Sequence, residues 1–228
     1  MTVTIHTAHS ALSTNPDALT DDEINAWRNI PVAFAADLSP DEQVDIAIRP
    51  LCAPGKQPKL CGRALTALCE PPDFGAVLHA TDRVKPGDVL VIAANGCDDA
   101  AMIGEIISGH LRSKGCVGVI CDGAVRDAAT IANWSDFSVF TRFVNPLGPT
   151  GAEKGEVQHP VVIGKHTINP GDLMLGDDDG LVALSPASAR EKLSDAQAKL
   201  GLEDDWIAAL GSGKSCADVF GLKAAVNK

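Results

Sequence analysis

A strand–helix–strand passage in the middle of the chain constrains the fold more than any other feature. Residues 89–93 form an apolar run typical of a buried strand, and Asn95-Gly96 predicts a turn after it. The next apolar residues have helical spacing, which predicts an amphipathic helix carrying Ile103, Ile106, Ile107 and Leu111 on one face. Lys114-Gly115 predicts the end of that helix, and residues 116–121 form a second short apolar run. The passage therefore predicts helices packed against a sheet.

Two Pro-Gly-Asp turns, at residues 86–88 and 170–172, flank this passage. Proline fixes φ at the second position of a turn and glycine accepts a positive φ at the third, so each turn should begin a new strand. Further strands are predicted over residues 137–143 and after Gly180. Because strands outnumber helices and do not alternate regularly with them, the predicted class is α+β, with helices layered against sheets.

The N-terminal residues have no periodic pattern. Residues 1–19 are mostly polar, so we expect a flexible N-terminal arm there. Thr20 and Glu23 form a capping box, which predicts a short helix over residues 21–29.

The folded domain is therefore expected to span residues 20–186. A last helix is predicted from about Ala187, with Ala189, Leu193, Ala196 and Leu200 at helical spacing. It leads to Glu203 and to a tail, which together make residues 187–228 a C-terminal extension.

The composition excludes several classes of partner. The chain has 19 basic and 30 acidic side chains, a net charge of −11, so neither a nucleic-acid backbone nor an anionic membrane surface would attract it. No apolar run reaches the roughly 20 residues needed to cross a bilayer, and no signal-peptide pattern begins the chain. The seven cysteines form no C-x-x-C pair, which favours reduced, packed thiols over the alternative of a zinc or redox site. We therefore expect a cytoplasmic protein.

Two carboxylates and a guanidinium are spaced so that the predicted passage brings them together. Glu105 begins the predicted helix, and Arg126-Asp127 follows the second strand. A helix from Glu105 to Ser113 spans about 13 Å, and the strand over residues 116–121 returns about 20 Å. Helix out and strand back therefore place Arg126 and Asp127 at the same end as Glu105.

This group of residues suits a divalent metal and a small keto acid. An exposed helix start would direct backbone N–H groups at a carboxylate, from Gly104, Glu105, Ile106 and Ile107, and Gly104 would allow close approach. Arg126 can grip a carboxylate and a neighbouring keto oxygen together. Asp127 is a hard oxygen ligand for Mg²⁺ or Mn²⁺, whose waters Glu105 can hold. The alternative is that Arg126 and Asp127 form a surface ion pair at a helix start.

Two other motifs match known sites poorly. G-S-G-K-S at 211–215 resembles the end of a phosphate loop, but Ala208 stands where the first glycine is required. Residues 177–180, D-D-D-G, resemble a calcium loop without its later glutamate, so a tight turn is predicted there.

Several segments, taken in order, resemble one family. They are G-x-A-x-T (62–66), P-G-D-V-L-V-I (86–92), G-E-I-I (104–107), G-V-I-C-D-G-A-V-R-D (118–127), P-G-D (170–172) and D-D-D-G-L-V-A-L-S-P (177–186). Over about residues 20–222 the chain resembles the RraA-like superfamily, and within it the class II 4-hydroxy-4-methyl-2-oxoglutarate / 4-carboxy-4-hydroxy-2-oxoadipate aldolases. Its C-terminal extension resembles that of the aldolases, whereas the ribonuclease regulators of the superfamily are shorter. The segments at 94–99 and 141–148 depart from the common form, and both are candidates for lining a pocket.

The resemblance implies a swivelling β/β/α fold assembled as trimers or hexamers, with sites between subunits. It implies that the C-terminal extension packs on a neighbouring subunit and that Glu203 reaches the neighbour's site. It also implies that Asp127 anchors Mg²⁺ or Mn²⁺, and that Arg126 with the 104–107 amides holds the pyruvyl end of the substrate. Glu105 and Glu203 would then assist removal of the C4 hydroxyl proton before the C3–C4 bond breaks.

The sequence leaves three functions open. The first is a metal-dependent aldolase of aromatic-acid catabolism, which cleaves a 4-hydroxy-2-oxo dicarboxylic or tricarboxylic acid to pyruvate and a second oxo-acid. The second is a lyase or decarboxylase acting on another oxo-acid, because the same enolate chemistry would decarboxylate oxaloacetate. The third is a non-catalytic binding protein of the ribonuclease-regulator type.

Overall fold

The structure is a computed structural model that describes residues 17–222. Its helices are α1 (Asp21–Trp27), α2 (Val32–Leu38), the 3₁₀ turn η1 (Pro40–Glu42), α3 (Gly75–Thr81), α4 (Glu105–Ser113), α5 (Ala128–Ile131), α6 (Pro186–Gly211) and α7 (Cys216–Val219). Its strands are β1 (Arg49–Pro50), β2 (Leu60–Leu68), β3 (Asp88–Ile103), β4 (Gly118–Val125), β5 (Ser138–Val144), β6 (Glu156–Val157), β7 (Val161–Ile163), β8 (His166–Ile168), β9 (Leu173–Asp177) and β10 (Gly180–Leu184).

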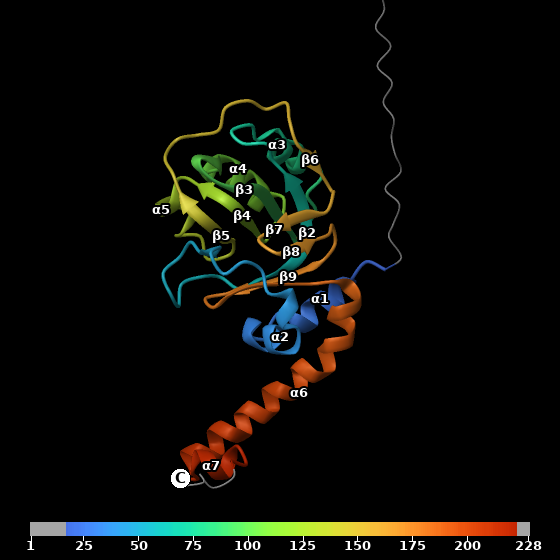
Figure 1. Cartoon of the computed structure of the whole chain (residues 1–228), viewed down its shortest axis with the longest axis vertical. Coiled ribbons are helices and arrows are strands. Elements are labelled where there is room, and N and C mark those ends of the chain that lie inside the picture. The colour runs from blue at the N-terminus through green and yellow to red at the C-terminus, as the bar shows by residue number, and fades with distance from the viewer. Residues whose placement is uncertain (1–16, 223–228) are drawn as a thin grey trace, which may run out of the picture.

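Most of the strands form one mixed, nearly closed sheet (Figure 1). The strand order is β1-β5-β4-β3-β2-β9-β10, with β6 also paired to β2. The central strands β2, β3, β4 and β5 are parallel, whereas β9 and β10 form an antiparallel hairpin that joins β2. Strands β7 and β8 form a separate two-stranded sheet.

The two faces of the central sheet are covered differently. On one face, Leu111 of α4 and Ile131 of α5 pack with Ile92 of β3 in a buried apolar cluster. On the other face, Val161 of the β7–β8 sheet packs with Val91 of β3. This arrangement is the predicted layered β/β/α fold, and the predicted α+β class is confirmed.

Both Pro-Gly-Asp turns begin strands, as predicted. Gly87 has a φ of 85° and Gly171 a φ of 91°, which is the backbone region that glycine adopts most easily. The carboxylates of Asp88 and Asp172 each accept the backbone N–H of the residue three positions earlier, so each aspartate closes its turn. Burial raises the pKa of both carboxyls.

Strand β3 is much longer than the sequence predicted. Asn95 and Gly96 have positive φ values of 50° and 67°, as in a turn, but the strand does not end there. Its pairing with β4 slips repeatedly between Ala93 and Ile103, so the extra residues bulge out of the ladder and β3 continues. The predicted end of the strand at Asn95-Gly96 is therefore wrong.

The predicted amphipathic helix is correspondingly shorter. Because α4 begins after Gly104, Ile103 belongs to β3 and not to the helix. Leu111 is fully buried as expected, whereas Ile106 is 75% exposed and does not contribute to the core face. The helix ends where predicted, at Gly115 with a φ of 86°.

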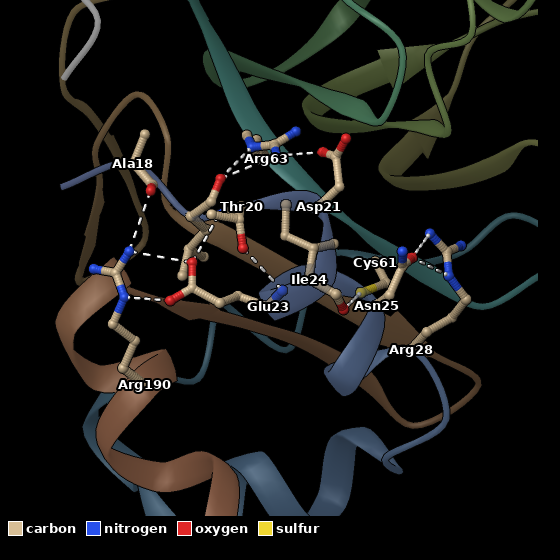
Figure 2. A network of polar contacts seen from close by, with 11 residues as sticks. Ala18, Thr20, Asp21, Glu23, Ile24, Asn25, Arg28, Cys61, Arg63 and Arg190 are labelled. Atoms are coloured by element: carbon tan, nitrogen blue, oxygen red, sulfur yellow. Dashed lines mark hydrogen bonds and ion pairs between the residues drawn. The ribbon is translucent and has the colours of Figure 1, made fainter. Parts of the chain in front are cut away.

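The predicted capping box is present and also ties α1 to α6 (Figure 2). The Thr20 hydroxyl accepts the Glu23 N–H at 3.2 Å, and the Glu23 carboxylate accepts the Thr20 N–H at 2.7 Å. Arg190 of α6 donates to the same carboxylate at 2.6 Å and to the carbonyl of Ala18 at 3.1 Å. The hydrogen bonds from Arg190 and Thr20 lower the pKa of Glu23 to about 2.

The predicted N-terminal arm falls mainly on residues 1–16, which lie outside the described residues. Leu19, at the end of that predicted arm, is buried among α1 and the neighbouring helices. Its carbonyl accepts the Nε–H of Arg63 from β2 at 3.1 Å. The folded body therefore includes Leu19, one residue before the expected boundary.

Helix α6 leaves the body of the protein at its C-terminal half (Figure 1). In its first half, Ala189 and Ala196 are buried, and Trp27 Nε1 donates to the Ala189 carbonyl at 3.1 Å. The second half, which carries Glu203, runs away from the sheet and ends beside α7. Within residues 17–222, no helix combines the length and the apolar character needed to span a membrane.

All seven cysteines lie within the described residues and are free thiols. Burial raises the pKa of Cys61, Cys69 and Cys116 to about 11, 12 and 11. Thiols with raised pKa values carry little reactive thiolate, in agreement with their predicted packing role.

Candidate functional site

A pocket of about 270 Å³ lies where α4 begins and β4 ends. It is lined by Phe74, Met102, Ile103, Gly104, Ile106, Ile107, Arg126, Asp127, Gly148 and Pro149. Its polar wall comes from Arg126 and Asp127, and its other side chains are apolar. The structure thus brings five of the seven site residues proposed from the sequence into one pocket: Gly104, Ile106, Ile107, Arg126 and Asp127. Glu105 and Glu203 are not among its lining residues.

Asp127 connects the two elements that meet at the pocket. Its Oδ2 accepts the backbone N–H of Glu105 at 3.0 Å, and Arg126 Nε lies 3.6 Å from the same oxygen. Asp127 itself has left-handed backbone angles, with φ 59° and ψ 33°. The chain turns sharply there, so that the carboxylate caps the first turn of α4 from outside the helix.

Position 104 has no room for a side chain, because the side chains of Arg126 and Asp127 pack directly against Gly104. A Cβ at this position would overlap Asp127 Oδ2 and would lie 2.8 Å from Arg126 Cγ. Its φ of −144° is extended backbone that any residue adopts. The close approach of Arg126 and Asp127, and not the backbone conformation, therefore requires glycine here.

The first turn of α4 has backbone N–H groups that precede its hydrogen-bond ladder. The ladder begins with the N–H of Ser108, which donates to the carbonyl of the residue before the helix at 3.0 Å. Asp127 takes the N–H of Glu105, which leaves those of Ile106 and Ile107 for a ligand. These groups carry partial positive charge and favour an anion. The side chain of Glu105 is half-buried at the same turn.

Glu203 does not join this pocket within one chain. It lies in the second half of α6, which Figure 1 shows running away from α4 and α5. A role for Glu203 at this kind of pocket therefore requires a second copy of the protein.

Part of the pocket wall was missed in the sequence. Phe74, Met102 and Pro149 have no motif that would mark them, although Gly148 ends the 141–148 segment proposed above as a lining candidate. The other proposed segment, 94–99, does not line the pocket. It supports the wall instead, because the Asp98 carbonyl accepts Asn145 Nδ2 at 2.6 Å.

The donor set suits a hard cation that keeps most of its own ligands. Within residues 17–222 there is no group of three or more His, Cys, Asp or Glu side chains that could hold a metal ion. Asp127 is 37% exposed, and no described residue donates a hydrogen bond to its Oδ1. Mg²⁺ commonly binds one or two protein carboxylates together with waters and substrate oxygens. Asp127 therefore fits such an ion, whereas the four-ligand cage of a structural zinc does not fit.

Comparison with known proteins agrees with this fold. Residues 35–183 match the RraA-like family model, which is described as Aldolase/RraA. The chain therefore belongs to the RraA-like family.

Individual relatives cover most of the chain. A protein of Halalkalibacterium halodurans named "Putative 4-hydroxy-4-methyl-2-oxoglutarate aldolase" is 30% identical over 179 residues, which are 78% of this chain and 83% of the relative. A solved structure of an uncharacterized protein from Pseudomonas syringae pv. tomato is 26% identical, with a TM-score of 0.80 over 90% of this chain and 96% of that one. The RNA-processing inhibitor RraA from Thermus thermophilis shares the fold, with a TM-score of 0.61 and 24% identity over 68% of this chain and 92% of its own.

Proposed function

We propose that this protein is a cytoplasmic, divalent-metal-dependent class II aldolase of aromatic-acid catabolism. Its substrate would be a 4-hydroxy-2-oxo dicarboxylic or tricarboxylic acid, which it cleaves to pyruvate and a second oxo-acid. One observation carries the proposal: Arg126, Asp127 and the first turn of α4, with Ile106 and Ile107, line one pocket. The 30% identical relative with an aldolase name supports the same reaction class.

Arg126 and the first turn of α4 would bind the pyruvyl end of the substrate. The Arg126 side chain is 40% exposed at the pocket, so its planar fork can reach a ligand. A guanidinium pairs with a carboxylate oxygen and a neighbouring keto oxygen in one plane. The N–H groups of Ile106 and Ile107 would donate to the remaining carboxylate oxygen.

Asp127 is the residue that would hold Mg²⁺ or Mn²⁺ beside this position. A divalent cation bound there would supply positive charge that stabilises negative charge developing on the substrate in the transition state. The hydrogen bond from the Glu105 N–H fixes the orientation of the carboxylate that would hold the ion.

Cleavage then needs a base for the C4 hydroxyl proton. When that proton leaves, the C4–O bond becomes a carbonyl and the C3–C4 bond breaks. The electron pair of the broken bond passes to C3 and the C2 oxygen, forming an enolate whose charge Arg126 stabilises in place. Protonation at C3 completes pyruvate. We assign the proton transfers to the carboxylates of Glu105 and of Glu203 from a neighbouring copy.

The proposal includes an assembly of three or six copies with sites between them. Around the second half of α6, Leu202, Ile207 and Phe220 are exposed by 46%, 68% and 47%. Beside the pocket, Ile106 and Leu147 are exposed by 75% and 63%. Large exposed apolar side chains at both places suit packing of the extension on a neighbour.

The decisive test is pyruvate release from 4-hydroxy-4-methyl-2-oxoglutarate, coupled to lactate dehydrogenase, with Mg²⁺ and then with excess EDTA. We expect turnover that requires the metal and that Arg126→Ala lowers strongly. Arg28→Ala, which removes an exposed arginine directly after α1, is the matched control and should leave turnover unchanged. Absence of pyruvate release from this substrate, with oxaloacetate also inert, would contradict the proposal. Oxaloacetate turnover alone would instead favour a decarboxylase acting on another oxo-acid.

A non-catalytic binding role is the second candidate function. The observation that favours it is the shared fold with the RNA-processing inhibitor RraA. This role predicts no turnover of any oxo-acid together with measurable binding to a ribonuclease or helicase, which size-exclusion chromatography of the mixed proteins would detect.

A further inference from the structure

We propose that Asp73 is a positioning residue for Arg126. Through the loop of residues 145–155, Asp73 holds the backbone of Gly148 against the Arg126 guanidinium. The consequence for turnover rests on the proposed function, whereas the hold on the loop stands on the contacts of these residues alone.

Asp73 joins the start of α3 to the far end of the loop. Its side chain is buried, and its carboxylate accepts the backbone N–H groups of Gly75 at 2.8 Å, Glu153 at 3.0 Å and Lys154 at 3.1 Å. These N–H groups, led by that of Glu153, lower the pKa of the Asp73 carboxyl. One carboxylate therefore anchors two backbone segments that lie far apart in the sequence.

The middle of the loop is fitted to the segment that carries Asp73. The Thr150 N–H donates to the Pro72 carbonyl at 2.8 Å, and the Phe74 N–H donates to the Gly151 carbonyl at 3.2 Å. Gly151 has a φ of 93°, and a Cβ there would lie 2.6 Å from Asp73 Oδ2. Figure 1 shows the loop, in yellow to gold, passing over the sheet from the end of β5 to β6 beside α3. Its backbone is therefore fixed on the Asp73 side.

The other end of the loop is fixed next to Gly148. The Ala101 N–H donates to the Leu147 carbonyl at 2.8 Å, and the Leu147 N–H donates to Asn145 Oδ1 at 2.8 Å. Gly148 thus lies between two anchored stretches of backbone, one at Leu147 and one at Thr150.

Arg126 rests on this fixed backbone. A Cβ at Gly148 would lie 2.5 Å from Arg126 Nη1 and 3.4 Å from its Cζ. The ion pair with Asp127 reaches only Nε, at 3.6 Å, so it leaves the two outer nitrogens free to swing. Packing against Gly148 limits that swing, and the limit depends on the loop that Asp73 holds. A guanidinium held in one plane binds a carboxylate with less loss of conformational freedom.

The first test measures the exposure of Arg126 without any substrate. Phenylglyoxal reacts with exposed guanidinium groups, and mass spectrometry of peptides reports the rate at Arg126. We expect Asp73→Asn to raise this rate at least about threefold, because losing a hydrogen bond to a charged acceptor shifts the loop equilibrium by about tenfold. Asp172→Asn is the matched control: Asp172 is a buried turn aspartate with a backbone N–H bond, remote from the pocket, and its substitution should leave the Arg126 rate unchanged.

The second test measures pyruvate affinity by calorimetry in the presence of Mg²⁺. Asp73→Asn should raise the Kd about tenfold in the intact protein and should have no effect when Arg126→Ala is already present. A merely structural role would weaken binding equally in both backgrounds. Gly148→Ala should also raise the Kd while keeping the melting temperature, because its Cβ displaces only the end of a flexible side chain.

The two proposals fail in different ways. An unchanged Arg126 reaction rate in folded Asp73→Asn and Gly148→Ala proteins would overturn the positioning role. If the unsubstituted protein neither cleaves an oxo-acid nor binds pyruvate, the proposed function fails, and the phenylglyoxal rates still decide whether Asp73 positions Arg126.

Discussion

The pocket and the second, outer half of α6 differ in how firmly the rest of the chain holds them in place. At the pocket, Asp127 is bonded to the first turn of α4 and Gly148 lies between anchored stretches of loop. On the outer half of α6, the described packing is mainly the edge-to-face contact of Trp206 with Phe220, at 5.1 Å between ring centres. Contacts within one chain therefore shape the polar wall of the proposed site. Glu203, which is expected to complete the site, lies in a part of α6 that packs little against the rest of its own chain.

The largest expected effect concerns the chemistry of the pocket. Asp127→Ala should lower metal-dependent kcat/KM by about a thousandfold, the scale seen when a group that organises transition-state charge is removed. The melting temperature should fall by only about 2–4 °C, because the exposed pair with Arg126 contributes little and the lost helix-cap hydrogen bond costs about 1 kcal/mol. Asp136→Ala, which removes another exposed aspartate paired with an arginine, is the control. Equal activity losses in both variants would contradict a specific role for Asp127.

How firmly each of the two regions is held can be measured from the free energy of unfolding of variants in each. Leu111→Ala should lower the free energy of unfolding by about 2–5 kcal/mol, because Leu111 is fully buried on the inner face of α4. Leu202→Ala on the outer half of α6 should change it by less than about 1 kcal/mol in dilute protein, because Leu202 is 46% exposed. Urea unfolding followed by circular dichroism measures both. A larger loss for Leu202→Ala would show that the extension is held by its own chain after all.

The division of the site between copies can be tested by mixing. Glu203→Ala should lower kcat by about a hundredfold, as for loss of a group that transfers protons. If Glu203 acts in a neighbouring copy, a mixture of Glu203→Ala and Asp127→Ala chains should recover activity, because some sites then receive both intact residues. The measurement is turnover after the two variants are dissociated and reassembled together. If turnover does not recover under conditions in which the unsubstituted protein reassembles, Glu203 lies outside the site.

The smallest expected effect is a dependence of stability on pH near the base of α6. The pKa of Glu23 is lowered from 4.5 to about 2 in the folded protein, so the stability from its contacts is present above pH 4.5 and is lost as the pH falls toward 2. Glu23→Gln removes the titrating group. We expect the melting temperature of the unsubstituted protein to fall further across that interval than that of the variant, with a smaller difference in high salt. Parallel curves would contradict the lowered pKa.

Regular local patterns predicted the elements that meet at the pocket. The spacing of Leu111 within an apolar helix face and the glycine after the helix led to the correct end of α4. The capping box of Thr20 and Glu23 depends only on residues next to it in the sequence, and so does each Pro-Gly-Asp turn. Such features can be predicted without knowing the rest of the fold. Helix and strand lengths were then enough to bring Glu105 close to Asp127.

Features that depend on distant partners were not predictable in this way. The long course of β3 past Asn95 depends on slipped pairing with β4, which no local pattern records. Gly148 reaches the pocket in a loop whose later residues donate to Asp73, far away in the sequence, and Phe74 reaches it directly after Asp73. In the proposed assembly the surroundings of Glu203 come from a second copy, so neither the sequence pattern nor the isolated chain supplies them.

The left-handed backbone of Asp127 has a consequence for engineering. Most side chains are strained at a φ of 59°, and glycine adopts it without strain, so Asp127→Gly would relax the backbone at this turn. That gain offsets part of the stability lost with the hydrogen bond from the Glu105 N–H, so heat resistance alone exerts little selection for the carboxylate at residue 127. Libraries meant to make this protein more robust should keep that codon fixed, because selection for thermal survival alone would not preserve the group that the proposed catalysis requires.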